Sequence, residues 1–221
     1  MRVLGIDVSV RRGLDLVVLE QASAGRAVQY NIRHQQGQGT VRDVREVCRD
    51  LKPDCVTIDS PPSWARSGSS RDAERALMRE GVHSFFTPCK VKGVGNSFYE
   101  WMQVGFGVFR DIAADFPRYQ KGSFRKRAIE VFPYATAFFL SGGPRPEELS
   151  QVRWRRKILR MLGVDESALS NIDQVDAALA AVTGIYALRG DFKAFGDPDE
   201  GVIIVPELAV VSSCEMTGMT T

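Results

Sequence analysis

The chain has 221 residues, of which 44% are hydrophobic, and this is enough to build the packed core of one large domain. It carries 29 Lys and Arg against 27 Asp and Glu, so its net charge of +2 does not by itself indicate a nucleic-acid-binding protein, although local clusters can. No stretch approaches the roughly 20 apolar residues of a membrane span and no signal-peptide pattern is present, so we expect a cytoplasmic protein without membrane association.

The first 60 residues predict a β-β-β-α-β order. Three strand-like runs open the chain, at residues 2–9, 14–20 and 27–33. Short connections join them, which is typical of an antiparallel meander. Residues 40–51 place apolar side chains on one helical stripe with Thr40 as a cap, and residues 54–59 are typical of a buried strand.

The middle of the chain contains two irregular segments. Residues 60–70 form a loop rich in Pro, Gly and Ser, and residues 71–81 predict a helix that ends at Gly81. Residues 82–96 show no pattern typical of a helix or a strand, and we interpret them as a loop insertion. We expect both irregular segments to form a mobile rim over the functional site.

The remaining elements continue the alternation of helices and strands. A helix is expected at 97–116, a strand at 127–133, helices at 151–162 and 173–188, and a last strand at 201–207. We expect one domain over residues 1–221, with a disordered polar tail at 212–221.

Several carboxylates interrupt or end these hydrophobic elements. They are Asp7 after "VLGI", Asp59 after "CVTI", Glu130 within "RAIEVF", and Asp173 and Asp176 at the start of an Ala-rich helix. The two helical aspartates are three residues apart and share a helix face, so both can point toward a sheet that carries the others. Buried charges need partners, and carboxylate oxygens favour hard cations such as Mg²⁺ or Mn²⁺.

A pair of such ions stabilises both the attacking and the leaving oxygen of phosphodiester hydrolysis. The pattern therefore predicts a catalytic metal centre made of Asp7, Asp59, Glu130, Asp173 and Asp176, with Asp7, Asp59, Glu130 and Asp176 as metal ligands. The cysteines are scattered and predict neither a zinc site nor a disulfide framework: Cys48, Cys55, Cys89 and Cys214. Each acid alone also fits a structural role: Asp7 a turn, Asp173 the helix dipole, and Glu130 an exposed edge.

Basic side chains predict a surface that binds phosphates. Arg153, Arg156 and Arg160 share one side of the helix at 151–162, and Arg71 and Arg75 follow the loop after Asp59. We predict that these five arginines bind substrate, and the alternatives are a solvated helix face and ion pairs with nearby acids. Aromatic side chains are a further candidate for stacking on bases, or for core packing: Trp64, Phe85, Phe86, Tyr99 and Trp101.

At these residues the chain resembles a known family, domain-of-unknown-function family 429, whose members are predicted nucleases with an RNase H-like fold. The resemblance covers about residues 2–205 and is carried by "GIDVS" (5–9), "TIDSPP" (57–62), "RDAERALMREG" (71–81), "EVFPYA" (130–135) and "DQVDAALAAVTG" (173–184). It implies an α/β fold with a mixed five-stranded sheet, order 3-2-1-4-5, and helices on both faces. The strand-end Asp and the helical D-x-x-D-A also resemble the active-site layout of Holliday-junction resolvases.

By this resemblance Asp7 is the central ligand that bridges the ions, Asp59 or Glu130 is a second ligand, and the helix contributes Asp176 with Asp173. The chain is therefore expected to be a nuclease that depends on Mg²⁺ or Mn²⁺, with DNA or RNA as its partner. Two alternatives remain open. One is a catalytically inactive RNase H-like module that binds nucleic acid or protein. The other is an actin-like or sugar-kinase-type phosphotransferase, which "GIDVS" resembles but which needs a second domain and a second phosphate motif.

Overall fold

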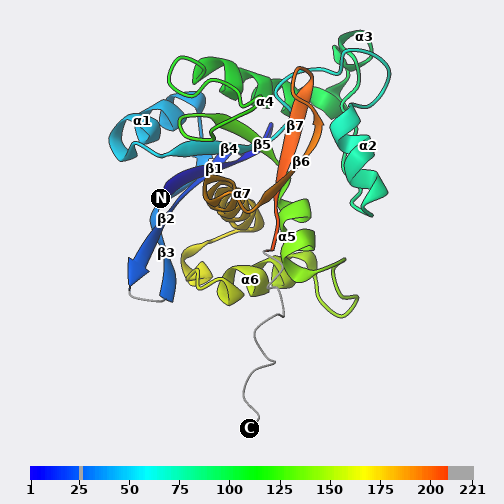
Figure 1. Ribbon diagram of the computed structural model, residues 1–221. Helices are drawn as coiled ribbons and strands as arrows, with labels where there is room; N and C mark the ends of the chain where they lie inside the picture. Colours follow the sequence, from blue (N-terminus) through cyan, green and yellow to red (C-terminus); the bar gives the residue numbers. More distant parts are fainter. Residues whose placement is uncertain (25–26, 209–221) are drawn as a thin grey trace.

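The computed structural model describes residues 1–24 and 27–208. Within these residues it contains seven strands: β1 (Arg2–Ser9), β2 (Gly13–Ala24), β3 (Ala27–Gly39), β4 (Cys55–Asp59), β5 (Ala128–Val131), β6 (Phe192–Asp197) and β7 (Gly201–Pro206). They form one mixed sheet in the order β3-β2-β1-β4-β5-β7-β6 (Figure 1). The tail at 212–221, for which the sequence predicts disorder, lies outside the described residues.

The sheet order confirms the predicted fold. Strands β1, β2 and β3 form an antiparallel meander, β4 lies parallel beside β1, and β5 lies parallel beside β4. This is the 3-2-1-4-5 order of an RNase H-like fold. The sheet has seven strands instead of five, because β7 pairs parallel with β5 and β6 pairs antiparallel with β7. Every residue of β7 is buried, so the strand needs a partner on each side.

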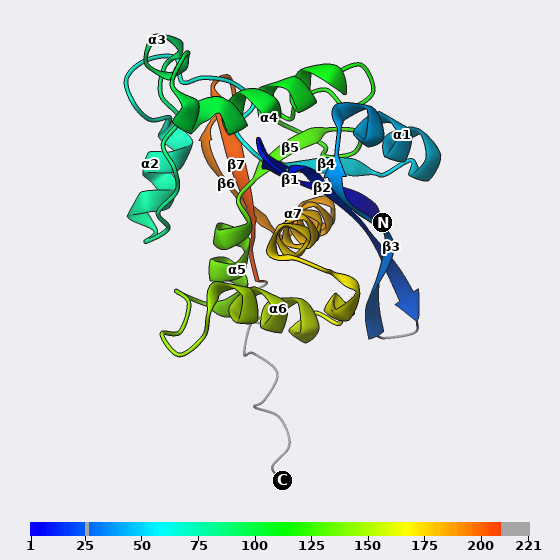
Figure 2. The same cartoon turned by 180° about the vertical axis from the view of Figure 1, so that it is seen from behind.

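Helices cover both faces of the sheet. They are α1 (Val41–Leu51), α2 (Asp72–Arg79), α3 (Lys90–Gly93), α4 (Glu100–Asp111), α5 (Pro133–Ser141), α6 (Gln151–Met161) and α7 (Ile172–Arg189), with 3₁₀ turns η1 (Ser97–Tyr99) and η2 (Glu166–Ala168). Helices α1 and α4 lie on one face and α5, α6 and α7 on the other (Figure 1). Seen from behind, α1 and α2 lie at opposite ends of the sheet (Figure 2).

Most helices occur where the sequence predicts them. Thr40 caps α1 as expected, and its hydroxyl accepts a hydrogen bond from the backbone N–H of Asp43. Helices α3 and α5 are the exceptions. The short helix α3 lies within residues 82–96, where the sequence predicts a loop. For α5, the sequence predicts a strand that runs to Pro133 and no helix after it. The strand ends at Val131 and Pro133 opens the helix, a position that suits proline because its missing N–H needs no partner there.

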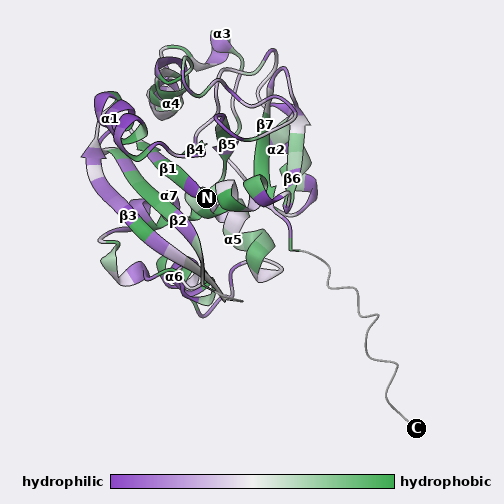
Figure 3. Cartoon of the chain, turned by 60° about the vertical axis from the view of Figure 1, so that its left-hand side comes forward, coloured by the Kyte–Doolittle hydropathy of each residue, from purple (hydrophilic) through white to green (hydrophobic). Residues whose placement is uncertain are grey.

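Side chains along each strand point alternately to the two faces of the sheet, and this separates two hydrophobic cores, one on each face. In β1, Leu4 and Ile6 belong to the core under α1 and α4, whereas Val3 belongs to the core under α7. Figure 3 shows β2 and β7 largely in hydrophobic green and the outward side of α1 in hydrophilic purple. Since successive residues point to opposite faces, Gly5 and Asp7 lie on the α7 side with Val3.

Two glycines let α7 lie directly on the sheet. A Cβ atom on Gly5 would lie 1.9 Å from the carbonyl oxygen of Ala177 and 2.7 Å from the amide nitrogen of Ala181. A Cβ atom on Gly184 would lie 2.7 Å from side-chain atoms of both Val3 and Thr57. Helix α7 therefore runs antiparallel to β1 at close range, and its first turn reaches the end of β1.

We expect Gly5→Ala to lower the free energy of unfolding by about 2 kcal/mol, because the added methyl group meets backbone atoms that cannot rotate away. Chemical denaturation measures the change. Gly143→Ala is the matched control, because a Cβ atom there meets nothing within 4 Å. Equal stability of the two variants would contradict the close packing of α7.

No helix among residues 1–24 and 27–208 is both long enough and apolar enough to cross a membrane.

Candidate active site

Three aspartates form a row across neighbouring strands. Asp7 at the end of β1 is in register with Asp15 of β2 and with Asp59 of β4. Side chains in register on adjacent strands point to the same face of a sheet. All three carboxylates therefore lie on the face that α7 covers, where β1 and β4 end.

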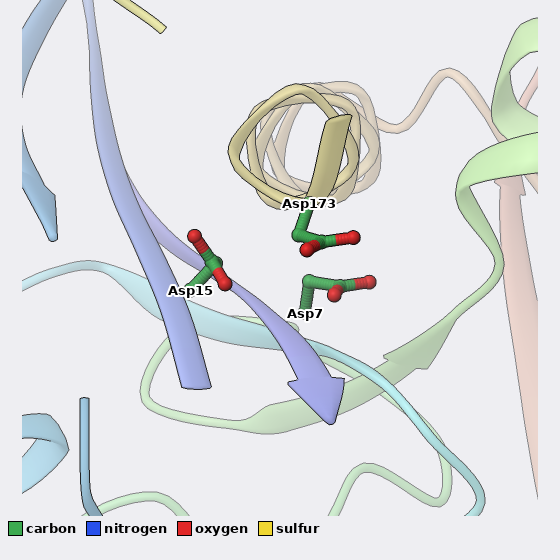
Figure 4. A group of neighbouring side chains, drawn as sticks. All are labelled: Asp7, Asp15 and Asp173. Atoms are coloured by element: carbon green, nitrogen blue, oxygen red, sulfur yellow. The ribbon is translucent and has the colours of Figure 1, made fainter. Parts of the chain in front are cut away.

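Helix α7 adds two more carboxylates. Asn171 caps the helix by accepting a hydrogen bond from the backbone N–H of Gln174, and Asp173 and Asp176 lie in the first two turns. Carboxylate oxygens of Asp7, Asp15 and Asp173 all lie within 4.8 Å of one another (Figure 4). Figure 4 shows Asp173 below the helix, with its carboxylate beside that of Asp7. Sheet and helix thus converge on one acidic cluster, which we define as Asp7, Asp15, Asp59, Asp173 and Asp176.

Burial and mutual repulsion disfavour the charged forms of these acids. Burial, followed by repulsion from Asp59, raises the pKa of Asp7 well above its ordinary value. Burial and repulsion from Asp176 raise the pKa of Asp59 to about 8. Burial raises the pKa of Asp176 to about 7 against the opposing effect of Arg155. The acidic cluster therefore holds more negative charge than the protein neutralises, which favours the binding of a cation.

Two arginines neutralise part of the acidic cluster. Arg12, from the turn between β1 and β2, donates from Nη2 to Oδ1 of Asp173 at 3.0 Å. Arg155 of α6 is buried and donates to Oδ2 of Asp176. The other oxygen of Asp176, Oδ1, is buried and has no hydrogen-bond partner among the described residues. An unpaired buried carboxylate oxygen in an all-oxygen donor set fits a hard divalent cation.

Glu130 points toward the other face of the sheet, but it is close enough to Asp59 for its negative charge to raise the pKa of that acid. Glu130 is in register with Ile58, whose side chain belongs to the core under α1 and α4, whereas the next residue, Asp59, points toward α7. Arg71 binds Glu130 instead, and its Nη1 donates to Oε2 of Glu130 at 2.7 Å. The role of Glu130 as a metal ligand stays a prediction.

Arg71 is one of the most deeply buried side chains in the described part of the protein, with 1% of its surface exposed. Its Nε donates to Oε1 of Glu74 at 2.9 Å. The other oxygen of Glu74 accepts from the backbone N–H of Arg71 at 3.0 Å and from that of Thr87 at 2.9 Å. Arg71, Glu74 and Glu130 therefore form a buried ion triad that ties α2, β5 and the insertion together.

The acidic cluster opens into a cavity of about 640 Å³. The cavity is lined by the carboxylates of Asp7, Asp59, Asp173 and Glu130, the arginines Arg11, Arg12, Arg71 and Arg155, and the rings of Phe85 and Trp101. Ser60 and Pro61 from the Pro-rich loop and Ser84 from the insertion also reach it. Both segments that the sequence predicts as a rim thus border the site, and their mobility stays a prediction.

The other predicted substrate-binding arginines lie outside this cavity. Arg75 pairs with Asp72, and Arg156 and Arg160 pair with Glu166. Arg153 is exposed on α6 and makes no ion pair within the described ranges. Their roles in substrate binding stay predictions. The arginines that border the acids are instead Arg11, Arg12 and Arg155, which the sequence did not indicate.

The sheet order, with a helix that brings acids to the end of the first strand, defines an RNase H-like protein. The chain belongs to the family described as "Protein of unknown function (DUF429)", whose model matches residues 5–201. A solved structure of RuvC from Thermus thermophilus is similar at 17% sequence identity with a TM-score of 0.48, over 86% of this chain and 97% of that chain. A comparison with curated proteins finds no match.

Proposed function

We propose that this protein is a nuclease that hydrolyses phosphodiester bonds in nucleic acid with the help of Mg²⁺ or Mn²⁺. The observation that carries the proposal is the acidic cluster, where carboxylates from three adjacent strands and one helix meet at a cavity. Asp7 lies at its centre, between Asp15 and Asp59 on the sheet and close to Asp173 on the helix. We propose Asp7, Asp15 and Asp173 as the central ligands, with Asp59 and Asp176 beside them.

The chemistry of the donors supports this choice of ion. All the groups are carboxylates, and hard cations with oxygen ligands fit them better than zinc does. The raised pKa values of Asp7, Asp59 and Asp176 and the unpaired oxygen of Asp176 indicate that the acidic cluster lacks positive charge. When bound, a divalent cation neutralises the developing charge on the phosphate oxygens and favours attack by water.

The arginines at the cavity have separate tasks in this proposal. Arg12 is largely exposed at the wall, so its guanidinium is free to turn from Asp173 toward a phosphate of the substrate. Arg155 is buried against Asp176 and holds that carboxylate in place. Each guanidinium nitrogen of Arg71 donates to Glu74 or Glu130, so in this proposal Arg71 supports the wall of the cavity.

Asp7→Asn tests the proposal. Single-stranded, duplex, branched and hybrid nucleic acids are incubated with Mg²⁺ or Mn²⁺ and each protein, and calorimetry measures Mn²⁺ binding. We expect wild-type protein to cleave at least one substrate and Asp7→Asn to cleave none. The variant should also bind Mn²⁺ at least about a hundredfold more weakly. Loss of a residue that only hydrogen-bonds to a metal ligand already weakens metal binding by up to about a hundredfold, and Asp7 is proposed as a ligand itself.

Asp50→Asn on the outer surface of α1 is the matched control and should behave as wild type. Absence of both cleavage and Mn²⁺ binding in the wild-type protein would contradict the proposal. The RNase H-like fold would then serve as a binding module.

A further inference from the structure

An exposed group of aromatic rings lies beside the cavity. We define the aromatic cluster as Phe85 of the insertion, Phe98 and Tyr99 of η1, and Trp101 of α4. The ring centroids of Phe85 and Phe98 are 5.5 Å apart, those of Phe85 and Trp101 are 6.3 Å apart, and those of Phe98 and Tyr99 are 5.0 Å apart. All three pairs meet edge to face, so the rings support one another while their flat faces point in different directions.

The aromatic cluster is not part of a core. Phe85 is 63% exposed and Phe98 is 53% exposed, although burial of either ring would stabilise the fold. Trp64 anchors the group from the inside through edge-to-face contacts with Tyr99 and Phe106. The contacts of Trp64 thus fix the position of the exposed rings. A contiguous exposed apolar group of this kind is typical of a binding surface.

The position and charge of the aromatic cluster indicate its partner. Phe85 and Trp101 line the same cavity as Asp7, so the rings and the proposed metal ligands face one space. Arg11 and Arg12 are exposed and line this cavity as well. Aromatic rings that share a cavity with exposed arginines match a partner that carries both flat apolar surfaces and negative charge. Nucleotides with unpaired bases have both, whereas the bases of a continuous duplex are already stacked on each other.

We propose that the aromatic cluster stacks on unpaired bases of the strand that enters the cavity. The substrate class is then single-stranded nucleic acid, or nucleic acid with an unpaired segment. This inference rests on the proposed function, because it assigns bases to the rings and phosphates to the acidic cluster of the same cavity. Phe85 is the central residue, since it contacts both Phe98 and Trp101 and borders the acids.

Binding measured without cleavage tests the inference. Fluorescence anisotropy in EDTA gives the affinity of the full chain for a labelled thymidine oligonucleotide, for an abasic oligonucleotide of the same length, and for a duplex. We expect the thymidine oligonucleotide to bind most tightly. Phe85→Ala should weaken its binding about tenfold, as expected for the loss of one stacked base, and should leave abasic binding unchanged.

Two further variants separate stacking from other effects. Val91→Ala removes an exposed apolar side chain of the same insertion, 93% exposed and without a ring, and should bind as wild type. Phe85→Tyr keeps the ring and should retain wild-type affinity. Circular dichroism confirms that each variant is folded.

Several results would overturn the inference. One is equal affinity of Phe85→Ala and wild type for the thymidine oligonucleotide. The others are equal affinity of wild type for abasic and thymidine oligonucleotides, no oligonucleotide binding at all, and tightest binding to the duplex. Failure of the stacking inference can be distinguished from failure of the proposed nuclease function. If stacking is seen but neither Mn²⁺ binding nor cleavage occurs, the nuclease proposal fails and the stacking surface stands. If cleavage occurs but Phe85→Ala binds normally, the stacking surface fails.

Discussion

Arg71→Ala is expected to lower the free energy of unfolding by about 4 kcal/mol, because it leaves a buried ion pair without its cation. The side chain is 1% exposed and binds the carboxylates of Glu130 and Glu74. Removal of the guanidinium leaves both acids buried without their cation and opens a cavity between α2 and β5. Denaturation with urea measures the loss.

Two comparisons show whether the loss comes from burial of unpaired charge. Arg75→Ala removes the next arginine of α2, which is partly exposed and pairs with Asp72, so the loss should stay below about 1 kcal/mol. In Arg71→Met combined with Glu74→Gln and Glu130→Gln, no unpaired charge remains, and most of the lost stability should return. A loss in Arg71→Ala no greater than that in Arg75→Ala would contradict the role of the buried ion triad.

The ion triad also bears on the predicted role of Glu130. Burial raises the pKa of Glu130, and Arg71 opposes that rise because it stabilises the charged carboxylate. A divalent cation that binds Glu130 must therefore compete with Arg71 for the same two oxygens. We therefore propose that Glu130 stays paired with Arg71 and that the cation binds among the aspartates on the α7 side.

The parts of the site that follow from local sequence were predictable. Asp7 and Asp59 each end a short apolar run, and because β1 and β4 are parallel neighbours, both side chains reach the same edge. The D-x-x-D spacing places Asp173 and Asp176 in the first turns of α7. The order of the first five strands followed in the same way, from the short connections of the meander and from the resemblance to an RNase H-like family.

The parts that depend on strand register and pleat were not predicted. Asp15 is in register with Asp7 across the hairpin, and its signal was an acid within the apolar run "LDLVVL". Glu130 lines the same cavity as the aspartates, but its register with Ile58 directs its side chain toward Arg71, and the sequence did not predict this ion pair. These assignments require the exact pairing of strands, which a one-residue shift reverses.

Helix α6 and strand β6 show a second reason why parts of the structure could not be predicted from the sequence. The sequence pattern placed Arg153, Arg156 and Arg160 on one side of α6 and gave no role to Arg155, which is buried because Asp176 supplies its partner. An ion pair between two helices leaves no periodic trace in the sequence. Strand β6 is a half-exposed edge strand, so its apolar pattern is weak, and the pairing with β7 decides its structure.

The acidic cluster gives the metal-free protein a characteristic dependence on pH. The pKa of Asp59 in the folded state is about 8, above its ordinary value of 3.8, so the folded state binds the proton more tightly than the unfolded state does. The stability that this proton provides is fully present below about pH 4 and is lost as the pH rises through about 8. The raised pKa values of Asp7 and Asp176 act in the same direction.

Asp59→Asn should remove most of this loss. Asn has the shape of a protonated Asp, so at pH 4 the variant and the wild type should be equally stable, whereas at pH 9 in EDTA the variant should be more stable by about 3 kcal/mol. Urea denaturation at both values of pH measures the difference, with Asp50→Asn on α1 as the control that shows no gain. Mn²⁺ should reverse the order at pH 9, because a cation that binds the ionised cluster stabilises the wild-type protein and binds the variant less well. A wild-type protein that is as stable at pH 9 as its Asp59→Asn variant in EDTA would show that the aspartates do not repel one another, and the main physical reason for a cation at this site would be lost.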